Sequence, residues 1–103
     1  MDNLKCFINY NGEGLYIVEK GDTLSSIALK FNTTKNMIIL DNRLTEEVKE
    51  KDYLYIKRYK TVYSVDVCDT LDSIAKKFNM TKEEILRLNR INYIYPTLKI
   101  VIE

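Results

Sequence analysis

The chain has 103 residues, 46 % hydrophobic and 30 % charged, which is enough for one ordinary domain or two very small ones. Its 16 basic and 15 acidic residues leave a net charge of +1 without a basic stripe, so nucleic acid is not an expected partner. No apolar run approaches the roughly 18 residues of a membrane span, so none is expected.

Residues 1–14 are expected to form an N-terminal arm or an extra strand. Residues 4–10, the turn-prone residues 11–14 and the apolar run 15–18 can form a hairpin, and an arm without strand pairing is the alternative. The N-terminus has no long apolar region and no small-residue cleavage site. We therefore expect a protein made in the cytoplasm without a signal peptide.

The stretch from Tyr16 to Arg43 returns 47 residues later, from Tyr63 to Arg90, with 16 of its 28 positions identical. A repeat of this strength decides the architecture, because each copy must form the same structural unit. The sequence predicts one unit over residues 15–57 and a second over residues 62–103. A linker over residues 58–61 is expected to join them.

Each copy is expected to run strand, helix, helix, strand. The alternating runs 15–18 and 62–65 predict the first strands, and Asp-Thr pairs precede the first helices as candidate caps. Asn32 and Asn79 are expected to end these helices, because Asn tolerates a left-handed backbone. Apolar residues at i, i+3, i+4 and i+7 define the buried helix face: Leu24, Ile27, Ala28 and Phe31, then Leu71, Ile74, Ala75 and Phe78.

The second half of each copy is expected to hold another helix and a closing strand. Thr81 and Glu84 have the spacing of a capping box, whereas Met37 replaces the glutamate in the first copy. The apolar runs 53–56 and 99–102 predict the closing strands.

This order of elements, with these residues, resembles the LysM domain. The resemblance rests on aromatic-x-Val at Tyr16 and Tyr63, on Gly-Asp-Thr-Leu at 21–24, on Asp-Thr-Leu at 69–71 and on helices ending in Asn, and it covers about four fifths of the chain. It implies an α+β fold of two tandem βααβ units. Each would be a two-stranded antiparallel sheet with two helices on one face. It also implies binding of glycans that contain N-acetylglucosamine, such as peptidoglycan and chitin.

By the same resemblance, the sugar would lie in a shallow groove between the first turn and the loop after the second helix. In the first unit the walls would be Gly21, Asp22, Thr23 and Leu24 against Asn42, Arg43, Leu44 and Thr45. In the second they would be Asp69, Thr70 and Leu71 against Asn89, Arg90, Ile91 and Asn92, with Tyr95 covering a sugar face. For the Asp, Thr and Leu residues, capping and core packing are equally open explanations.

The chain departs from the LysM pattern at its glycines. The Pro-Gly-Gln turn of the family is Glu-Lys-Asp at residues 50–52 and Pro-Thr-Leu at residues 96–98, and Cys68 stands where the first unit has Gly21. Because glycine permits close backbone approach and positive φ, these changes are expected to reshape the groove walls.

No residue pattern predicts catalysis, a metal or a cofactor. The chain has no histidine and no Cys-x-x-Cys pair, and Cys6 and Cys68 are expected to be reduced and partly buried. The carboxylate pairs Glu46-Glu47 and Glu83-Glu84 are expected on loops or helix starts, with no cleft that would make them a catalytic pair. We therefore expect a non-enzymatic protein without cofactors.

Two function classes remain open. In the first, the protein is a non-catalytic module whose partner is peptidoglycan or a related N-acetylglucosamine polymer, bound by two weak sites acting together. In the second, it is a structural adaptor with protein partners in a spore coat or phage-tail-like assembly. We expect it to act at the cell wall or spore surface, or within an assembly built inside the cell.

Overall fold

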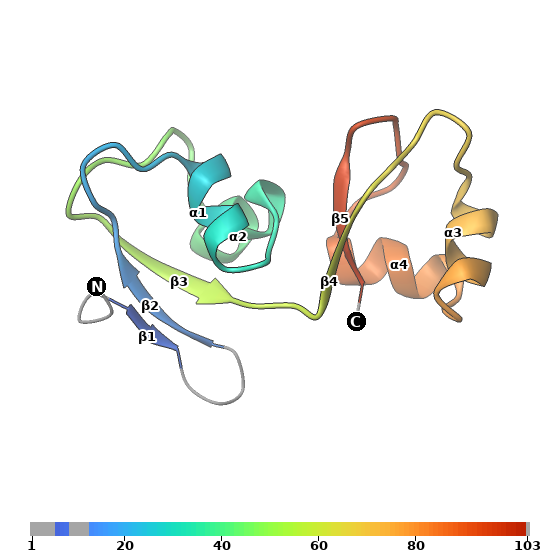
Figure 1. Cartoon of the computed structure of the whole chain (residues 1–103), viewed down its shortest axis with the longest axis horizontal. Helices are drawn as coiled ribbons and strands as arrows, with labels where there is room; N and C mark the ends of the chain where they lie inside the picture. The colour runs from blue at the N-terminus through green and yellow to red at the C-terminus, as the bar shows by residue number, and fades with distance from the viewer. Residues whose placement is uncertain (1–5, 9–12, 103) are drawn as a thin grey trace. The chain divides into compact units, whose positions relative to one another are not determined.

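The computed structural model describes residues 6–8 and 13–102, and the chain divides at Tyr59 into two compact units, each with its own apolar core. We call them unit 1 and unit 2. Each unit contains the order strand, helix, helix, strand that the repeat predicts, and the fold is α+β (Figure 1). No helix in the described part of the chain is long and apolar enough to cross a membrane.

Unit 1 is built on a three-stranded antiparallel sheet in the order β1 (Cys6–Ile8), β2 (Glu13–Ile17), β3 (Tyr53–Lys57). In the register Tyr16 lies opposite Leu54, and both side chains are buried beneath the helices. Strand β1 pairs with the outer edge of β2, so this sheet has one strand more than the expected two. Residues 9–12 of the expected hairpin lie outside the described residues.

Helices α1 (Leu24–Lys30) and α2 (Lys35–Asn42) cover one face of this sheet (Figure 1). Thr23 caps α1 in a box with Ser26, and Asn32 follows the helix with φ of 53°, the left-handed conformation expected there. Thr34 caps α2 by accepting from the Met37 amide. No capping box forms, because Met37 has replaced the glutamate that would bond back to Thr34, and the Met37 side chain is buried.

Unit 2 has a two-stranded sheet of β4 (Thr61–Ser64) and β5 (Lys99–Ile102), with α3 (Leu71–Lys77) and α4 (Lys82–Asn89). The Thr81–Glu84 capping box forms as predicted. The core gathers the predicted apolar stripe with the inward residues of the strands, and its fully buried centre is Ile74, Ile85 and Ile100. Each helix is at most eight residues long, so packing, and not intrinsic propensity, supplies most of its stability.

One asparagine in each unit ties the end of the second helix to the free edge of the closing strand. In unit 2 the Asn89 side chain donates to the carbonyls of Ile85 and Val101 (both 3.0 Å) and accepts from the Val101 amide at 2.7 Å. Asn42 makes the same three bonds to Ile38 and Tyr55 in unit 1. These amides satisfy strand groups that no neighbouring strand reaches.

Replacing Asn89 by Ala is therefore expected to destabilise unit 2 by about 2–3 kcal/mol, because the buried Val101 amide and carbonyl lose their partners. Amide hydrogen exchange at Val101 and urea unfolding measure this loss. Asn42→Ala in the less buried site of unit 1 serves as the matched comparison and should cost less. Unchanged protection of the Val101 amide in Asn89→Ala would contradict the assigned role.

Candidate functional site

The turn before the first helix is held by a tyrosine–aspartate hydrogen bond. The Asp22 carboxylate accepts from the Tyr16 hydroxyl at 2.5 Å and from the Glu19 amide at 2.8 Å. Lys30 donates to the same hydroxyl at 2.8 Å and lies 3.8 Å from the carboxylate. The position of Asp22 suggested a cap for α1, but its side chain braces the preceding turn instead, and the N-cap is Thr23.

Unit 2 repeats this arrangement. The Asp69 carboxylate accepts from the Tyr63 hydroxyl at 2.6 Å and from the Asp66 amide at 2.8 Å, and the Lys77 ammonium lies 4.8 Å from the centre of the Tyr63 ring. The first wall of each proposed groove is thus fixed by contacts inside the protein.

These contacts shift the acidity of both carboxyls. The Tyr63 hydroxyl, with the Asp66 amide, holds the pKa of Asp69 below its usual value. Burial alone would raise the pKa of Asp22, but hydrogen bonds from Tyr16 and Glu19 and the charge of Lys30 outweigh it, so that pKa is also lowered. Because the folded pKa lies below the unfolded one, each carboxylate stabilises its turn above about pH 4 and loses that effect as pH falls through the folded pKa.

Replacing Tyr63 by Phe is expected to move the pKa of Asp69 up toward its ordinary value of 3.8, because the largest lowering contribution is removed. The acid-dependent part of the stability of unit 2 should shrink accordingly. Carbon-13 titration of the Asp69 carboxyl measures the shift, and Tyr95→Phe, outside this turn, is the control. An unchanged Asp69 pKa would show that the hydroxyl does not hold the carboxylate.

The other predicted wall begins at the last residue of the second helix, Asn42 or Asn89, and continues into the loop after it. Asn42 and Asn89 direct their side chains to the closing strand, and a contact of these residues with sugar stays a prediction. Arg43 and Arg90 end their helices in the left-handed conformation, with φ of 54° and 55°, and are exposed.

The glycine-poor turns keep the backbone that glycine would adopt. Lys51 and Thr97 stand at the glycine position of the family turn, and both have φ of 77°. Their amides donate to the carbonyls of Val18 and Val65 at 2.7 and 2.9 Å. The substitutions expected to reshape the groove walls thus leave these turns hydrogen-bonded in a conformation that is strained for a side-chain-bearing residue.

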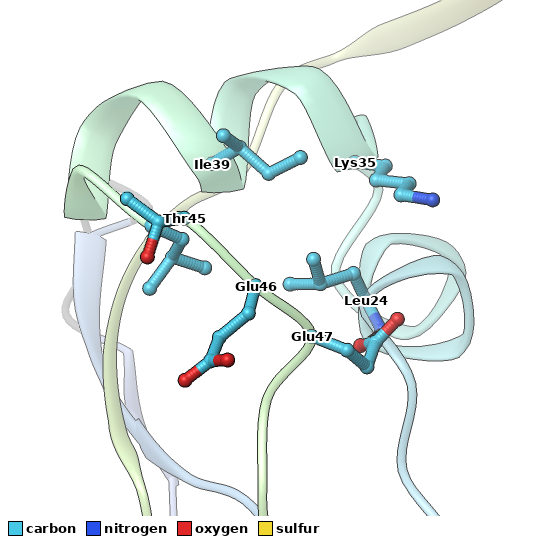
Figure 2. Close-up of a pocket in the computed structure, with 7 residues that line it drawn as sticks. Leu24, Lys35, Ile39, Thr45, Glu46 and Glu47 are labelled. Carbon is cyan, nitrogen blue, oxygen red and sulfur yellow. Dashed lines mark hydrogen bonds between the residues drawn. The ribbon is translucent and has the colours of Figure 1, made fainter.

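In unit 1 a hollow of about 420 Å³ opens between the start of α1 and the loop after α2, and Figure 2 shows its lining. Ligand pockets commonly have volumes of about 300–1,000 Å³. The hollow brings together three predicted site residues, Leu24, Leu44 and Thr45, and does not include the others. Its full lining is Leu24, Lys35, Ile39, Leu44, Thr45, Glu46 and Glu47.

Four of these residues were missed as site residues from the sequence: Lys35, Ile39, Glu46 and Glu47. Glu47 bends toward Leu24 and accepts from its backbone amide at 2.7 Å, whereas the Glu46 carboxylate points away from Leu24 (Figure 2). The sequence shows Glu46-Glu47 as an acidic pair before a valine. It does not show that the Glu47 carboxylate binds the start of α1, 23 residues earlier in the chain.

In unit 2 the corresponding loop is aromatic. Tyr93 is 68 % exposed and Tyr95 48 % exposed, and their ring centres lie 6.1 Å apart. Tyr93 was also missed from the sequence, although its place between Asn92 and Tyr95 in the predicted wall was a usable signal. The predicted residues Thr70, Arg90 and Asn92 are exposed, while Leu71 and Ile91 pack partly against the core.

Cys68, at the start of the first wall, is a free and exposed thiol, so the expectation that it is partly buried is wrong. The turn around it is closed by Asp66 and Asp69 and needs no buried side chain at this position. The side chain of Cys6 lies outside what the structure describes.

Two small βααβ units, each with paired loops beside the first helix, define a tandem binding module. The chain belongs to the LysM domain family, whose model matches residues 16–56 and 63–102. LysM domains are non-catalytic binding domains for glycans that contain N-acetylglucosamine. A comparison with curated protein sequences finds no significant match.

Among solved structures, the chain is similar to the spore cortex-lytic enzyme SleL of Bacillus megaterium QM B1551, with 26 % identity over 85 % of this chain and a TM-score of 0.44. The SleL enzyme of Bacillus cereus matches at 21 % identity over 89 % of this chain, also with a TM-score of 0.44. The chain spans 22 % of the length of each enzyme. The ectodomain of a receptor like kinase matches at 16 % identity, with 94 % of this chain, 60 % of that one and a TM-score of 0.40.

Proposed function

We propose that this protein is a non-catalytic module that binds N-acetylglucosamine polymers of the peptidoglycan or chitin type. The observation that carries the proposal is the exposed Tyr93–Tyr95 pair on the loop after the second helix of unit 2. Tyrosine presents an apolar ring face together with a polar hydroxyl, which suits the alternating CH and OH groups of a sugar.

The neighbouring groups complete a site for an acetamido sugar. An N-acetyl group offers one hydrogen-bond donor, one acceptor and a methyl, so it needs backbone polar groups and an apolar floor but no charge. Leu71 and Ile91 are only partly buried, so each keeps accessible apolar surface, and Asn92 is exposed. The proposed contacts in unit 2 are therefore Thr70, Leu71, Ile91, Asn92, Tyr93 and Tyr95.

A second candidate function rests on the outer face of the unit 1 sheet, which neither helix covers. Leu15 is 49 % exposed there and Tyr53 68 % exposed, on neighbouring strands. Exposed apolar groups on a sheet face suit contact with another protein. This observation favours an adaptor role in a spore coat or phage-tail-like assembly.

Sedimentation of the purified protein with insoluble peptidoglycan and with chitin tests the proposal. We expect retention that high salt does not abolish, because the proposed contacts are uncharged. Tyr93→Ala should weaken binding about fivefold, from the loss of roughly 1 kcal/mol of aromatic contact.

Tyr53→Ala is the matched control, because both tyrosines are 68 % exposed and only Tyr93 lies on the proposed groove. It should bind like the unaltered protein. Absence of retention on either polymer would contradict glycan binding. Loss of retention in Tyr53→Ala alone would place the contact on the sheet face instead.

A further inference from the structure

One difference between the two units lies in the loop beside the proposed groove. Val48 is buried in the core of unit 1, and Ile94 packs against the core of unit 2 at the same point of the loop. The residue just before each is Glu47 in unit 1 and Tyr93 in unit 2. No acidic residue occurs between Asn89 and Thr97 in the whole loop of unit 2.

The Glu47 carboxylate occupies a hydrogen-bond donor of the hollow, the backbone amide of Leu24. One carboxylate oxygen accepts from the Leu24 amide at 2.7 Å and from the Val48 amide at 3.2 Å. Leu24 lines the hollow, so this amide is a donor that an incoming carbonyl would otherwise use. At the equivalent amide of Leu71, the described part of unit 2 shows no hydrogen bond to the protein.

We infer that Glu47 is a specificity-determining residue, whose carboxylate closes the hollow of unit 1 to the carbonyl of an acetamido sugar and leaves unit 2 to read that group. A backbone amide hydrogen is fully used by a charged acceptor at 2.7 Å. A ligand carbonyl that uses the Leu24 amide must displace the carboxylate from it, so binding in unit 1 loses one charge-assisted hydrogen bond that unit 2 does not have to break. The inference rests on the proposed function, because it concerns the same groove.

The other charged residues of the hollow, Glu46 and Lys35, do not occupy the Leu24 amide. Glu46 lines the same space, but its carboxylate points away from Leu24 (Figure 2). Lys35 is on the α2 side of the hollow and, within the part of the chain that the structure describes, forms no ion pair with Glu47. Removing Glu46 therefore changes the charge of the hollow by the same amount as removing Glu47, while leaving the Leu24 amide occupied.

The test is a residue-resolved NMR titration of the full chain with the tetramer of N-acetylglucosamine, which reports each unit separately. In the unaltered protein, we expect Leu71, Asn92 and Tyr93 to respond well before the residues of the hollow. Glu47→Ala should bring Ile39 and Thr45 into the response, with binding to unit 1 about tenfold tighter, the equivalent of one charge-assisted hydrogen bond.

Three variants separate the effect of the occupied amide from the effects of charge and of folding. Glu47→Gln keeps an oxygen that can accept from Leu24, so unit 1 should stay closed although the charge is gone. Glu46→Ala should also leave unit 1 closed. Glu47→Tyr introduces the residue that unit 2 carries and should open unit 1 as Ala does, which provides a second opening variant if Glu47→Ala does not fold.

The inference fails if unit 1 and unit 2 of the unaltered protein bind the tetramer equally. It also fails if unit 2 binds while neither opening variant, with unit 1 folded, gains any response in the hollow. If Glu46→Ala opens unit 1 as well as Glu47→Ala does, charge and not occupation of the amide is responsible, and the inference is overturned. Absence of binding in both units of every variant would instead overturn the proposed function as a whole.

Discussion

The fold of each unit depends on one asparagine that joins the second helix to the closing strand. A unit of about 45 residues has few buried side chains with which to fix its loops, so single polar contacts carry more of the structure than in larger domains. Asn42 and Asn89 satisfy both backbone groups of a strand residue at an edge where no further strand follows. This contact fixes the end of the helix, and hence the point from which the groove loop leaves.

The opposite wall is fixed in a similar way, by the tyrosine–aspartate bonds of Tyr16 with Asp22 and of Tyr63 with Asp69. Both walls are therefore braced from within each unit. Differences between the two grooves arise from the side chains placed on the loops and from the loop of unit 2, which is one residue shorter between Asn89 and Ile94 than between Asn42 and Val48 in unit 1. A carboxylate at Glu47 and an exposed ring at Tyr93 give two units of one fold different surfaces for a ligand.

Periodicity and repetition were sufficient to predict the order of elements and most of the core, and the resemblance to the LysM domain added the α+β fold. The apolar stripes of α1 and α3 are local patterns, and Thr23, Thr70 and Thr81 cap helices within three residues of their own positions. The resemblance to the LysM family extended the prediction to the two walls of the proposed groove in each unit. Strand β1 remained one of two alternatives, because three residues carry too little pattern to decide strand pairing.

What the sequence did not predict depends on contacts between distant residues. Asn89 was placed in the groove wall by the resemblance to the LysM family, whereas its side chain bonds to Val101, 12 residues away on a strand edge. Glu47 reaches an amide 23 residues earlier in the chain. Neither partner can be identified from local spacing, since the direction of one side chain depends on how two loops meet in space.

The central claim is that the two units offer different donors to the same sugar, and amide hydrogen exchange at Leu24 and Leu71 tests it most directly. We predict that the Leu24 amide is protected in the free protein and unchanged by the tetramer of N-acetylglucosamine. The Leu71 amide should exchange faster when free and become protected when the tetramer is added. Equal protection of both amides in the free protein, or no change at Leu71 on addition of the tetramer, would contradict the account.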